Sequence, residues 1–254
     1  MNSFIITPFF LDQPAPALEH LTQPGWTLNR PAGAPGNMSV VHEALADRVA
    51  RDVRAGNRPV SIAGDCCTAI GVMAGLQRAG LDPILVWLDA HGDFNTPEST
   101  VSGFIGGMPL AMMVGRGDLT LPRAVRLRPV AENDVFLCDA RDLDPAEEAL
   151  LEQSHVHHVP DLEKLPDRLP ADRQLYVHFD PDVMNPEDAP AMLYTALGGA
   201  RLDATHRVAE RLAATGRVVA ASLTVWQMSE DADRRTERAC LSTLGRLVGE
   251  AFLQ

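Results

Sequence analysis

The sequence of 254 residues has no apolar run that approaches the ~20 residues needed to span a membrane as a helix. Its first segment, residues 3–10, lacks a basic leader and is interrupted by Pro8, so it is typical of a strand rather than of a targeting signal. Basic residues are few relative to acidic ones. The chain has 22 lysines and arginines and 34 aspartates and glutamates, which gives a formal net charge of −12. This balance argues against nucleic acid and anionic membrane surfaces as partners.

Cysteine is also scarce. The four cysteines, Cys66, Cys67, Cys138 and Cys240, do not have the spacing of a secreted disulfide framework, and adjacent cysteines are poor candidates for a bridge. We therefore expect a reducing compartment, the cytoplasm. The length and the hydrophobic content of 46% suit one α/β domain that spans residues 1–254.

Strand and helix signals alternate along the chain, which predicts a three-layer α/β/α fold with a mainly parallel central sheet. Continuous apolar runs predict buried strands at 84–88, 135–138, 175–179 and 218–227. Periodic apolar spacing and capping signals predict helices at 40–55, 68–80, 203–215 and 234–252, and one that begins at Asp144. Residues 12–36 are rich in Pro and Gly and are expected to form a surface loop, while the loop at 94–107 is expected to be a substrate lid.

Two acidic clusters follow two of these predicted strands. Asp89-Ala90-His91-Gly92-Asp93 comes directly after residues 84–88, and Asp180-Pro181-Asp182 comes directly after residues 175–179. Ligand crevices of open α/β sheets lie at the carboxyl ends of the strands. Carboxylates crowded there would repel one another unless cations gathered them, so the clusters predict a pair of divalent ions.

A simpler interpretation is that these aspartates are caps and turn residues, since Asp-Pro commonly opens a turn. A third motif at a strand end makes the metal interpretation stronger, because Ala63-Gly64-Asp65-Cys66 follows a further apolar run at 59–62.

The order and spacing of these three motifs resemble those of the ureohydrolases, the family of binuclear manganese enzymes that includes arginase and agmatinase. Asn95-Thr96-Pro97, Ser102-Gly103 and Arg141-Asp142-Leu143-Asp144-Pro145 match the family too, and the resemblance runs from about residue 58 to the C-terminus. It implies two Mn²⁺ ions per chain and a metal-bridging hydroxide that attacks a guanidino carbon.

The resemblance assigns roles position by position. Asp89 and Asp180 would bridge the two metals, Cys66 and Asp93 would complete one site, and His91 and Asp182 would complete the other. Asn95, Ser102, Asp142, Asp144 and Glu147 match positions that hold the amino-acid end of the substrate, although each also suits an exposed polar loop residue. His178, two residues before Asp180, suits either a hydrogen-bonded core histidine or a proton carrier, and Asp93 is the other candidate for proton transfer.

Three positions depart from the family pattern. Cys66 stands where the family has a metal-binding His, so it is expected to be a thiolate ligand, the alternative being a small buried residue beside an incomplete site. Gly106 stands where arginases have a His that moves protons to the leaving amine. Trp226 stands at or beside the position of a Glu that pairs with the guanidinium, and Glu230 is the nearest carboxylate. Burying a charged guanidinium without that Glu would be costly.

Without that Glu, the site suits a neutral substrate. N-hydroxylation lowers the pKa of a guanidine, so an N-hydroxyguanidine could enter uncharged. These departures most resemble the Nω-hydroxy-L-arginine amidinohydrolase branch of D-cycloserine (antibiotic) biosynthesis, which releases L-ornithine and hydroxyurea. The alternatives are another ureohydrolase, of the arginase, agmatinase or formimidoyl type, and a non-catalytic metal-binding paralogue. The partner is expected to be a small guanidino amino acid, and a monomer is preferred over a homo-oligomer because the chain lacks the C-terminal extension of trimeric arginases.

Overall fold

The computed structural model describes residues 1–224 and 226–252. Its residue contacts divide the chain into two compact units made of interleaved segments. Unit 1 comprises Met1–Asp82, Asp93–Glu132 and Asp144–His155, and unit 2 comprises Pro83–Gly92, Asn133–Leu143 and Val156–Gln254.

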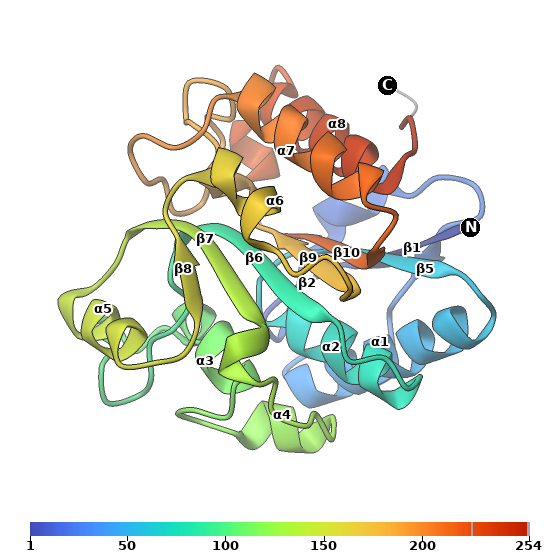
Figure 1. Cartoon of the computed structure of the whole chain (residues 1–254). Helices are drawn as coiled ribbons and strands as arrows, with labels where there is room; N and C mark the ends of the chain where they lie inside the picture. Colours follow the sequence, from blue (N-terminus) through green and yellow to red (C-terminus); the bar gives the residue numbers. More distant parts are fainter. Residues whose placement is uncertain (225, 253–254) are drawn as a thin grey trace. The chain divides into compact units, whose positions relative to one another are not determined.

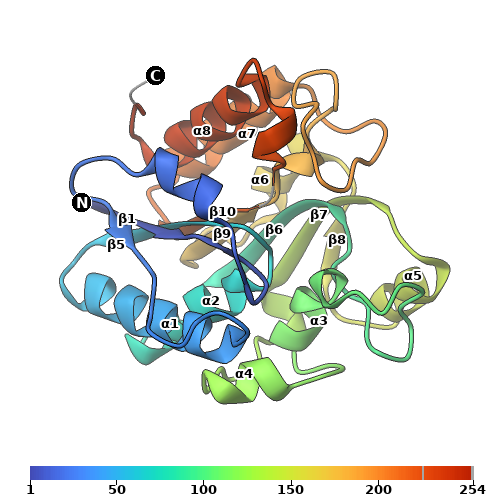
Figure 2. The same cartoon turned by 180° about the vertical axis from the view of Figure 1, so that it is seen from behind.

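Unit 1 is built on three parallel strands. β1 (Asn2–Thr7) pairs with β4 (Thr27–Leu28) on one side and with β5 (Arg58–Ala63) on the other. The helices of this unit are α1 (Met38–Arg54), α2 (Thr68–Arg78), α3 (Pro109–Met113), α4 (Thr120–Ala124) and α5 (Pro145–Glu152). Both views show α1 and α2 side by side (Figures 1 and 2). The two helices cross closely at Gly75. A Cβ atom at this position would lie only 2.6 Å from Cβ of Val49, so the close approach depends on the glycine.

The expected surface loop at residues 12–36 is partly wrong. It contains β4, the second strand β3 (Gln13–Pro14) of a small antiparallel pair with β2 (Phe9–Phe10), and a 3-10 helix at Pro16–Leu21 that buries Leu18 and Leu21. The Pro and Gly content that suggested a loop sets the turns between these short elements, and the two-residue strands are too short to show a periodic pattern.

Unit 2 holds five parallel strands in the order β10 (Val218–Thr224), β9 (Leu175–Phe179), β6 (Ile84–His91), β7 (Val135–Asp142) and β8 (His157–Val159). Its helices are α6 (Leu165–Arg168), α7 (Leu202–Ala214) and α8 (Arg235–Val248), and α7 packs on α8 (Figures 1 and 2). β6 and β9 are buried almost throughout, as their continuous apolar runs predicted.

Two predicted boundaries differ from the structure. The strand expected to reach Gln227 is β10, which ends at Thr224, and Val225 lies outside the described residues. The helix expected to reach Phe252 ends at Val248, because Gly249 takes a left-handed conformation (φ 67°) as its C-cap. The other predicted helices and strands are confirmed within a few residues.

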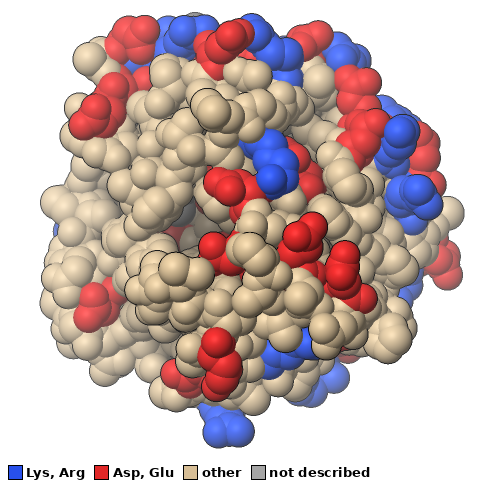
Figure 3. Space-filling model, turned by 90° about the vertical axis from the view of Figure 1, so that its left-hand side faces the viewer, with Lys and Arg blue, Asp and Glu red and all other residues tan. Residues whose placement is uncertain are grey.

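The negative charge counted in the sequence is visible on the surface. On the face drawn in Figure 3, acidic side chains gather near the centre of the view, with basic side chains more frequent toward the edge. None of the helices among residues 1–224 and 226–252 is both long and apolar enough to cross a membrane.

Candidate metal centre

The two acidic motifs lie together in unit 2 because the strands that precede them are neighbours. β6 and β9 run parallel, with Leu88 opposite Phe179, so their carboxyl ends coincide. The N–H of Asp180 donates to the carbonyl of Leu88 at 2.8 Å, which continues the pairing one residue past β9. Asp180 then opens the 3-10 turn Pro181–Val183, and its carboxylate accepts the N–H of Asp182 at 3.0 Å. The predicted meeting of strand ends therefore holds for these two motifs.

Asp89, His91 and Asp182 form a cluster with the spacing of metal ligands. One ligand atom from each lies within 4.8 Å of the other two. Nδ1 of His91 lies 2.9 Å from Oδ2 of Asp182 and 3.5 Å from Oδ1 of Asp89. On the other side of the ring, Nε2 of His91 lies 3.8 Å from Oδ2 of Asp142. Two carboxylates and one imidazole are a donor set that suits a divalent ion such as Mn²⁺ or Zn²⁺.

Backbone and indole donors hold these carboxylates in place. The N–H of His91 donates to Oδ1 of Asp89 at 2.7 Å, and the N–H of Ala90 donates to Oδ1 of Asp182 at 3.0 Å. Nε1 of Trp87, two residues before Asp89 on the same face of β6, donates to Oδ2 of Asp89 at 3.1 Å. Such outer partners fix the orientation of metal-binding groups. Trp87 had no assigned role in the sequence, where an apolar run gives no sign that an indole N–H serves a carboxylate.

The electrostatics of the cluster favour a bound cation. Burial, together with the neighbouring charge of Asp182, raises the pKa of Asp89 to about 7. Burial opposes the charge on His91, but hydrogen bonds and attraction to Asp182 and Asp89 outweigh it and raise the pKa of His91 to about 12. Both shifts show that these carboxylates attract positive charge, which a divalent ion would supply. The residues present fit a metal.

His178 is a buried side chain of β9. Its ring stacks on that of Trp87 with 3.8 Å between ring centroids, and its Nδ1 lies 2.8 Å from Oγ of Ser222, which also contacts the hydroxyl of Tyr176 at 2.8 Å. Burial lowers the pKa of His178 to about 3. The ring is therefore neutral at pH 7, which fits a core histidine better than a donor of protons.

The remaining predicted ligands, Cys66 and Asp93, belong to unit 1. Cys66 is 6% exposed and follows β5, while the next residue, Cys67, is the N-cap of α2. Asp93 is 5% exposed and has a left-handed backbone (φ 48°), and its carbonyl accepts the N–H groups of Leu110 at 2.9 Å and Ala111 at 3.1 Å. No disulfide joins any of the four cysteines in the described part of the chain.

Comparison with known proteins decides the family. Residues 20–249 match the model of the arginase family. The chain belongs to the arginase family. It is 29% identical to arginase of Bacillus subtilis (strain 168) over 224 residues, which cover 84% of this chain and 76% of that protein, and 29% identical to arginase of Bacillus caldovelox over 240 residues, covering 85% and 78%. The crystal structure of the Bacillus subtilis arginase matches with a TM-score of 0.85 at 25% identity and covers 100% of both chains. This likeness confirms the predicted three-layer α/β/α class with a mainly parallel sheet.

A more distant structure shares only the fold. The agmatine ureohydrolase of Thermoplasma volcanium matches with a TM-score of 0.71 at 15% identity and covers 97% of this chain and 88% of that one.

The arginase-family assignment makes this protein a ureohydrolase, a hydrolase of guanidino C–N bonds.

The residues that the arginase pattern assigns to the substrate are in different environments. Asn95 donates from Nδ2 to Oδ2 of Asp144 at 3.2 Å, both in unit 1, and Ser102 lies on an exposed loop where its Oγ accepts the N–H of Phe104 at 3.1 Å. The side chain of Asp142, in unit 2, is 64% exposed. Glu147 is buried, and its carboxylate accepts the N–H of Phe94 at 2.8 Å and the N–H of Asp144 at 3.3 Å, the second as part of a capping box at the start of α5.

The two departures from arginase at the guanidinium end are also visible. Trp226 is 7% exposed, and its indole N–H has no hydrogen-bond partner among the described residues. Glu230 is exposed, and its carboxylate accepts a weak 3.4 Å bond from Gln227, so it lies on the surface. A Cβ at Gly106 would lie 2.2 Å from Cε1 of Phe104, so the ring of Phe104 occupies the space that a side chain at this position would need.

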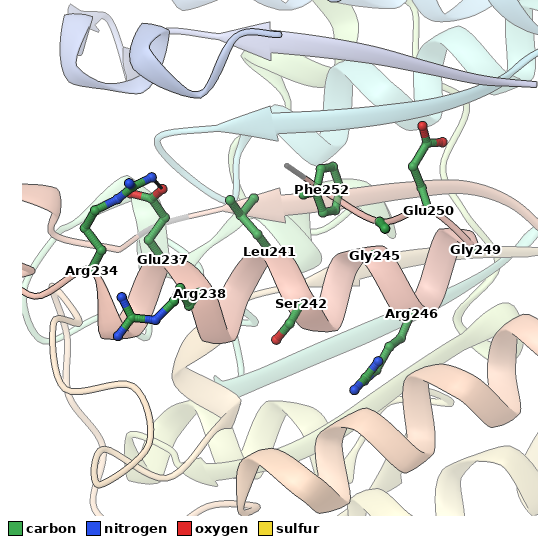
Figure 4. A pocket seen from close by; sticks show the side chains of 11 residues that line it. Arg234, Glu237, Arg238, Leu241, Ser242, Gly245, Arg246, Gly249, Glu250 and Phe252 are labelled. Carbon is green, nitrogen blue, oxygen red and sulfur yellow. Dashed lines mark hydrogen bonds and ion pairs between the residues drawn. The ribbon is translucent and has the colours of Figure 1, made fainter. Parts of the chain in front are cut away.

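A pocket of 720 Å³ lies elsewhere, along α8 and the segment that follows it (Figure 4). Its charged groups are already engaged: Arg234 pairs with Glu237, Arg238 donates to the carbonyl of Asp233 at 2.7 Å, and Arg246 lies 3.5 Å from Glu210. No metal-ligand cluster of three groups lies there among residues 1–224 and 226–252. The cluster of Asp89, His91 and Asp182 therefore lies at the strand ends and not in this pocket.

Proposed function

We propose that the protein is a binuclear manganese amidinohydrolase that cleaves Nω-hydroxy-L-arginine to L-ornithine and hydroxyurea. The observation that carries this proposal is the side chain at position 226. A buried tryptophan stands where arginases have the carboxylate that pairs with a guanidinium, and the nearest acidic residue, Glu230, is exposed.

The residues that would hold the two ions are those of the arginase pattern: Cys66, Asp89, His91, Asp93, Asp180 and Asp182. The cluster of Asp89, His91 and Asp182 supports one half of this set. When bound, two Mn²⁺ ions supply an activated water as the nucleophile. Among the chain's own residues, Trp87 and the N–H groups of Ala90 and His91 orient the carboxylates, so that little rearrangement accompanies metal binding.

A neutral guanidine fits a buried indole at position 226 better than a charged one does. A charged guanidinium buried against an indole, without a paired carboxylate, would lose its hydration without compensation. An N-hydroxyguanidine enters uncharged, and its hydroxyl can donate a proton. The absence of a side chain at Gly106 removes the proton-carrying histidine of arginases, so the proton for the leaving ornithine amine comes from the substrate, from water or from Asp93. A neutral His178 is a poorer donor.

The amino-acid end of the substrate is assigned to Asn95, Ser102, Asp142, Asp144 and Glu147, and Trp226 is assigned to the guanidino end. The exposure of Ser102 and Asp142 leaves both able to receive a ligand. Glu147 contributes by fixing Phe94 and the start of α5.

The deciding experiment compares L-arginine and Nω-hydroxy-L-arginine as substrates of the Mn²⁺-loaded protein, scored by ornithine release. Turnover of the hydroxylated substrate alone supports the proposal, and equal turnover of arginine overturns it in favour of ordinary arginase activity. The matched variant is Trp226→Glu, which restores a carboxylate and should raise arginine turnover while lowering that of the hydroxylated substrate. If neither substrate is cleaved although two ions are bound, agmatine and formimidoyl compounds are the next candidate substrates. If none of these is cleaved either, the protein is a non-catalytic metal-binding protein.

The thiolate at Cys66 would need protection from oxidation, which a cytoplasmic location would give. The preference for a monomer stays a prediction, which light scattering on the Mn²⁺-loaded protein would test.

A further inference from the structure

His178 has one ring nitrogen with no role in the mechanism given above. The side chain is 0% exposed, and its Nε2 has no hydrogen-bond partner among the residues that the structure describes. An unpartnered nitrogen in a protein interior is destabilising, which is reason to look for a missing partner.

The ring is held firmly from its other side. Oγ of Ser222 lies 2.8 Å from Nδ1, and that hydroxyl is in turn 2.8 Å from the hydroxyl of Tyr176. The face of the imidazole stacks on Trp87. Metal-binding histidines characteristically use one nitrogen for the ion and give the other to a hydrogen bond that sets ring orientation and tautomer. With Nδ1–H directed at Ser222, Nε2 carries the free lone pair.

The ring of His178 is close to a carboxylate already proposed as a ligand. A ring nitrogen of His178 lies within 4.8 Å of a carboxylate oxygen of Asp89. Two ligands bonded at about 2.1 Å to one ion are separated by roughly 3–4 Å, so a small adjustment of the two side chains on metal binding would bring both to bonding distance. Trp87 contacts both groups, through stacking on His178 and through its 3.1 Å bond to Asp89.

The composition of the proposed ligand set leaves room for this nitrogen. The arginase pattern has a His at position 66 and a Ser at position 178, whereas this chain has Cys66 and His178. The ligand set carried over to this chain therefore contains a single imidazole, that of His91. If His178 were also a ligand, the set would again contain two imidazoles, as in the arginase pattern.

We infer that His178 is a metal ligand, binding through Nε2 to the ion shared with Asp89, and that Ser222 positions its ring. This inference rests on the proposed binuclear function. It predicts two ligating histidines in unit 2, whereas the arginase pattern on its own predicts one.

The test counts ligating histidines in the Co²⁺-substituted protein. Each histidine bound to Co²⁺ gives a strongly shifted, exchangeable N–H proton signal in the NMR spectrum, and ¹⁵N-histidine labelling confirms its origin. Two such signals are expected. His178→Gln should remove one of them and weaken metal binding, measured by calorimetry, by on the order of 100-fold. Ser222→Ala should keep both signals and weaken binding by about 10-fold, as outer partners of ligands do. His157→Gln, which removes a histidine at the sheet edge, should change neither.

The outcomes separate the two levels of the argument. A single signal that survives His178→Gln, in a protein that binds two ions, overturns the assignment of His178 and leaves the proposed function standing. Failure of the wild-type protein to bind Co²⁺ or Mn²⁺ overturns the proposed function itself. Because His178 is buried, its replacement could also disturb folding, so the apo proteins are compared by thermal unfolding. If the variant lowers the apo and metal-loaded melting temperatures equally, His178 is only a core residue. Loss of the metal-dependent increase in melting temperature, with the apo value retained, supports the inference.

Discussion

The guanidinium of Arg141 donates a 2.8 Å hydrogen bond to the main-chain carbonyl of Asp182. The same side chain donates to the carbonyls of Leu197 at 3.0 Å, Ala196 at 3.2 Å and Val183 at 3.3 Å, and it pairs with the carboxylate of Asp139. Arg141 thus connects the end of β7 to both ends of the loop at 182–199. The sequence showed it only as part of a family motif and gave it no role, because its partners are main-chain carbonyls, which no side-chain pattern reveals.

Replacing Arg141 should affect both stability and metal binding. Arg141→Met leaves Asp139 as a largely buried, unpaired carboxylate and frees the backbone of Asp182, so we expect a loss of about 3–5 kcal/mol in the free energy of unfolding. Arg141→Lys should recover little, because an ammonium cannot reach the same set of acceptors. Urea unfolding of the apo protein and calorimetry with Mn²⁺ measure the two effects.

The double variant Arg141→Met with Asp139→Asn is the control for this prediction. Removing the stranded charge should restore much of the stability, whereas Mn²⁺ affinity should stay low because the carbonyl of Asp182 is still unheld. Full recovery of both quantities would mean that Arg141 only neutralises Asp139 and does not position Asp182.

Glu147 gives a second prediction, which separates a structural role from substrate contact. Both of its oxygens accept backbone N–H groups, from Phe94 and from Asp144. Glu147→Gln keeps the shape but replaces one acceptor with a donor, so we expect a loss of about 1–2 kcal/mol in stability and an unchanged KM. Urea unfolding and steady-state kinetics at saturating Mn²⁺ check both. A raised KM with unaltered stability would instead place Glu147 against the substrate.

The site could be predicted from the sequence where backbone topology decides the outcome. Parallel strands end at one edge, so the apolar runs before Asp89 and Asp180 were sufficient to bring those two motifs together. Roles set by hydrogen bonds between distant side chains could not be predicted in this way. The engagement of Glu147 with Phe94 and that of Trp87 with Asp89 depend on loop geometry and rotamers, which leave no periodic trace in the sequence.

The same distinction holds for the fold. The helices and the long buried strands follow from hydrophobic period, but β4 has two residues and exists because it pairs with Ile5 and Ile6 of β1. Tertiary pairing, not local propensity, forms such a strand. The end of α8 at Gly249 was missed because apolar residues continue beyond it, although a glycine after a basic last turn is a stop signal.

Position 106 gives a third prediction. Gly106→His would restore the residue type that arginases have there, but its Cβ would meet the ring of Phe104, which itself stacks near Phe10 with 6.5 Å between ring centroids. We therefore expect Gly106→His to lose about 1–3 kcal/mol in stability through overpacking and to gain no arginine turnover. Adding Phe104→Ala should relieve the clash, which the melting temperature would show. Equal stability of the single variant and the wild type would mean that Phe104 moves aside without cost.

The fourth prediction concerns His42, a residue of α1 that is 0% exposed and whose two ring nitrogens have no hydrogen-bond partner among the described residues. Burial lowers its pKa from 6.5 to about 3. Between these two values the unfolded chain binds a proton that the folded chain refuses, so stability falls as the pH falls through this window, by about 1.4 kcal/mol per pH unit. Above pH 6.5 both states are neutral at His42 and the residue contributes no pH dependence.

His42→Leu should therefore make stability less dependent on pH between 6 and 4 and should raise it at pH 7, because two unsatisfied polar atoms leave the core. The measurement is urea unfolding of the metal-free protein in EDTA at several pH values, so that loss of a bound ion at acid pH does not contribute. His155→Gln, which removes an exposed histidine, should reproduce the wild-type curve. His178 is buried in the same way and will keep part of the slope in His42→Leu, so the expected change is a reduction by about one proton and not its disappearance. An unchanged slope would show that His42 finds a partner or becomes hydrated in solution.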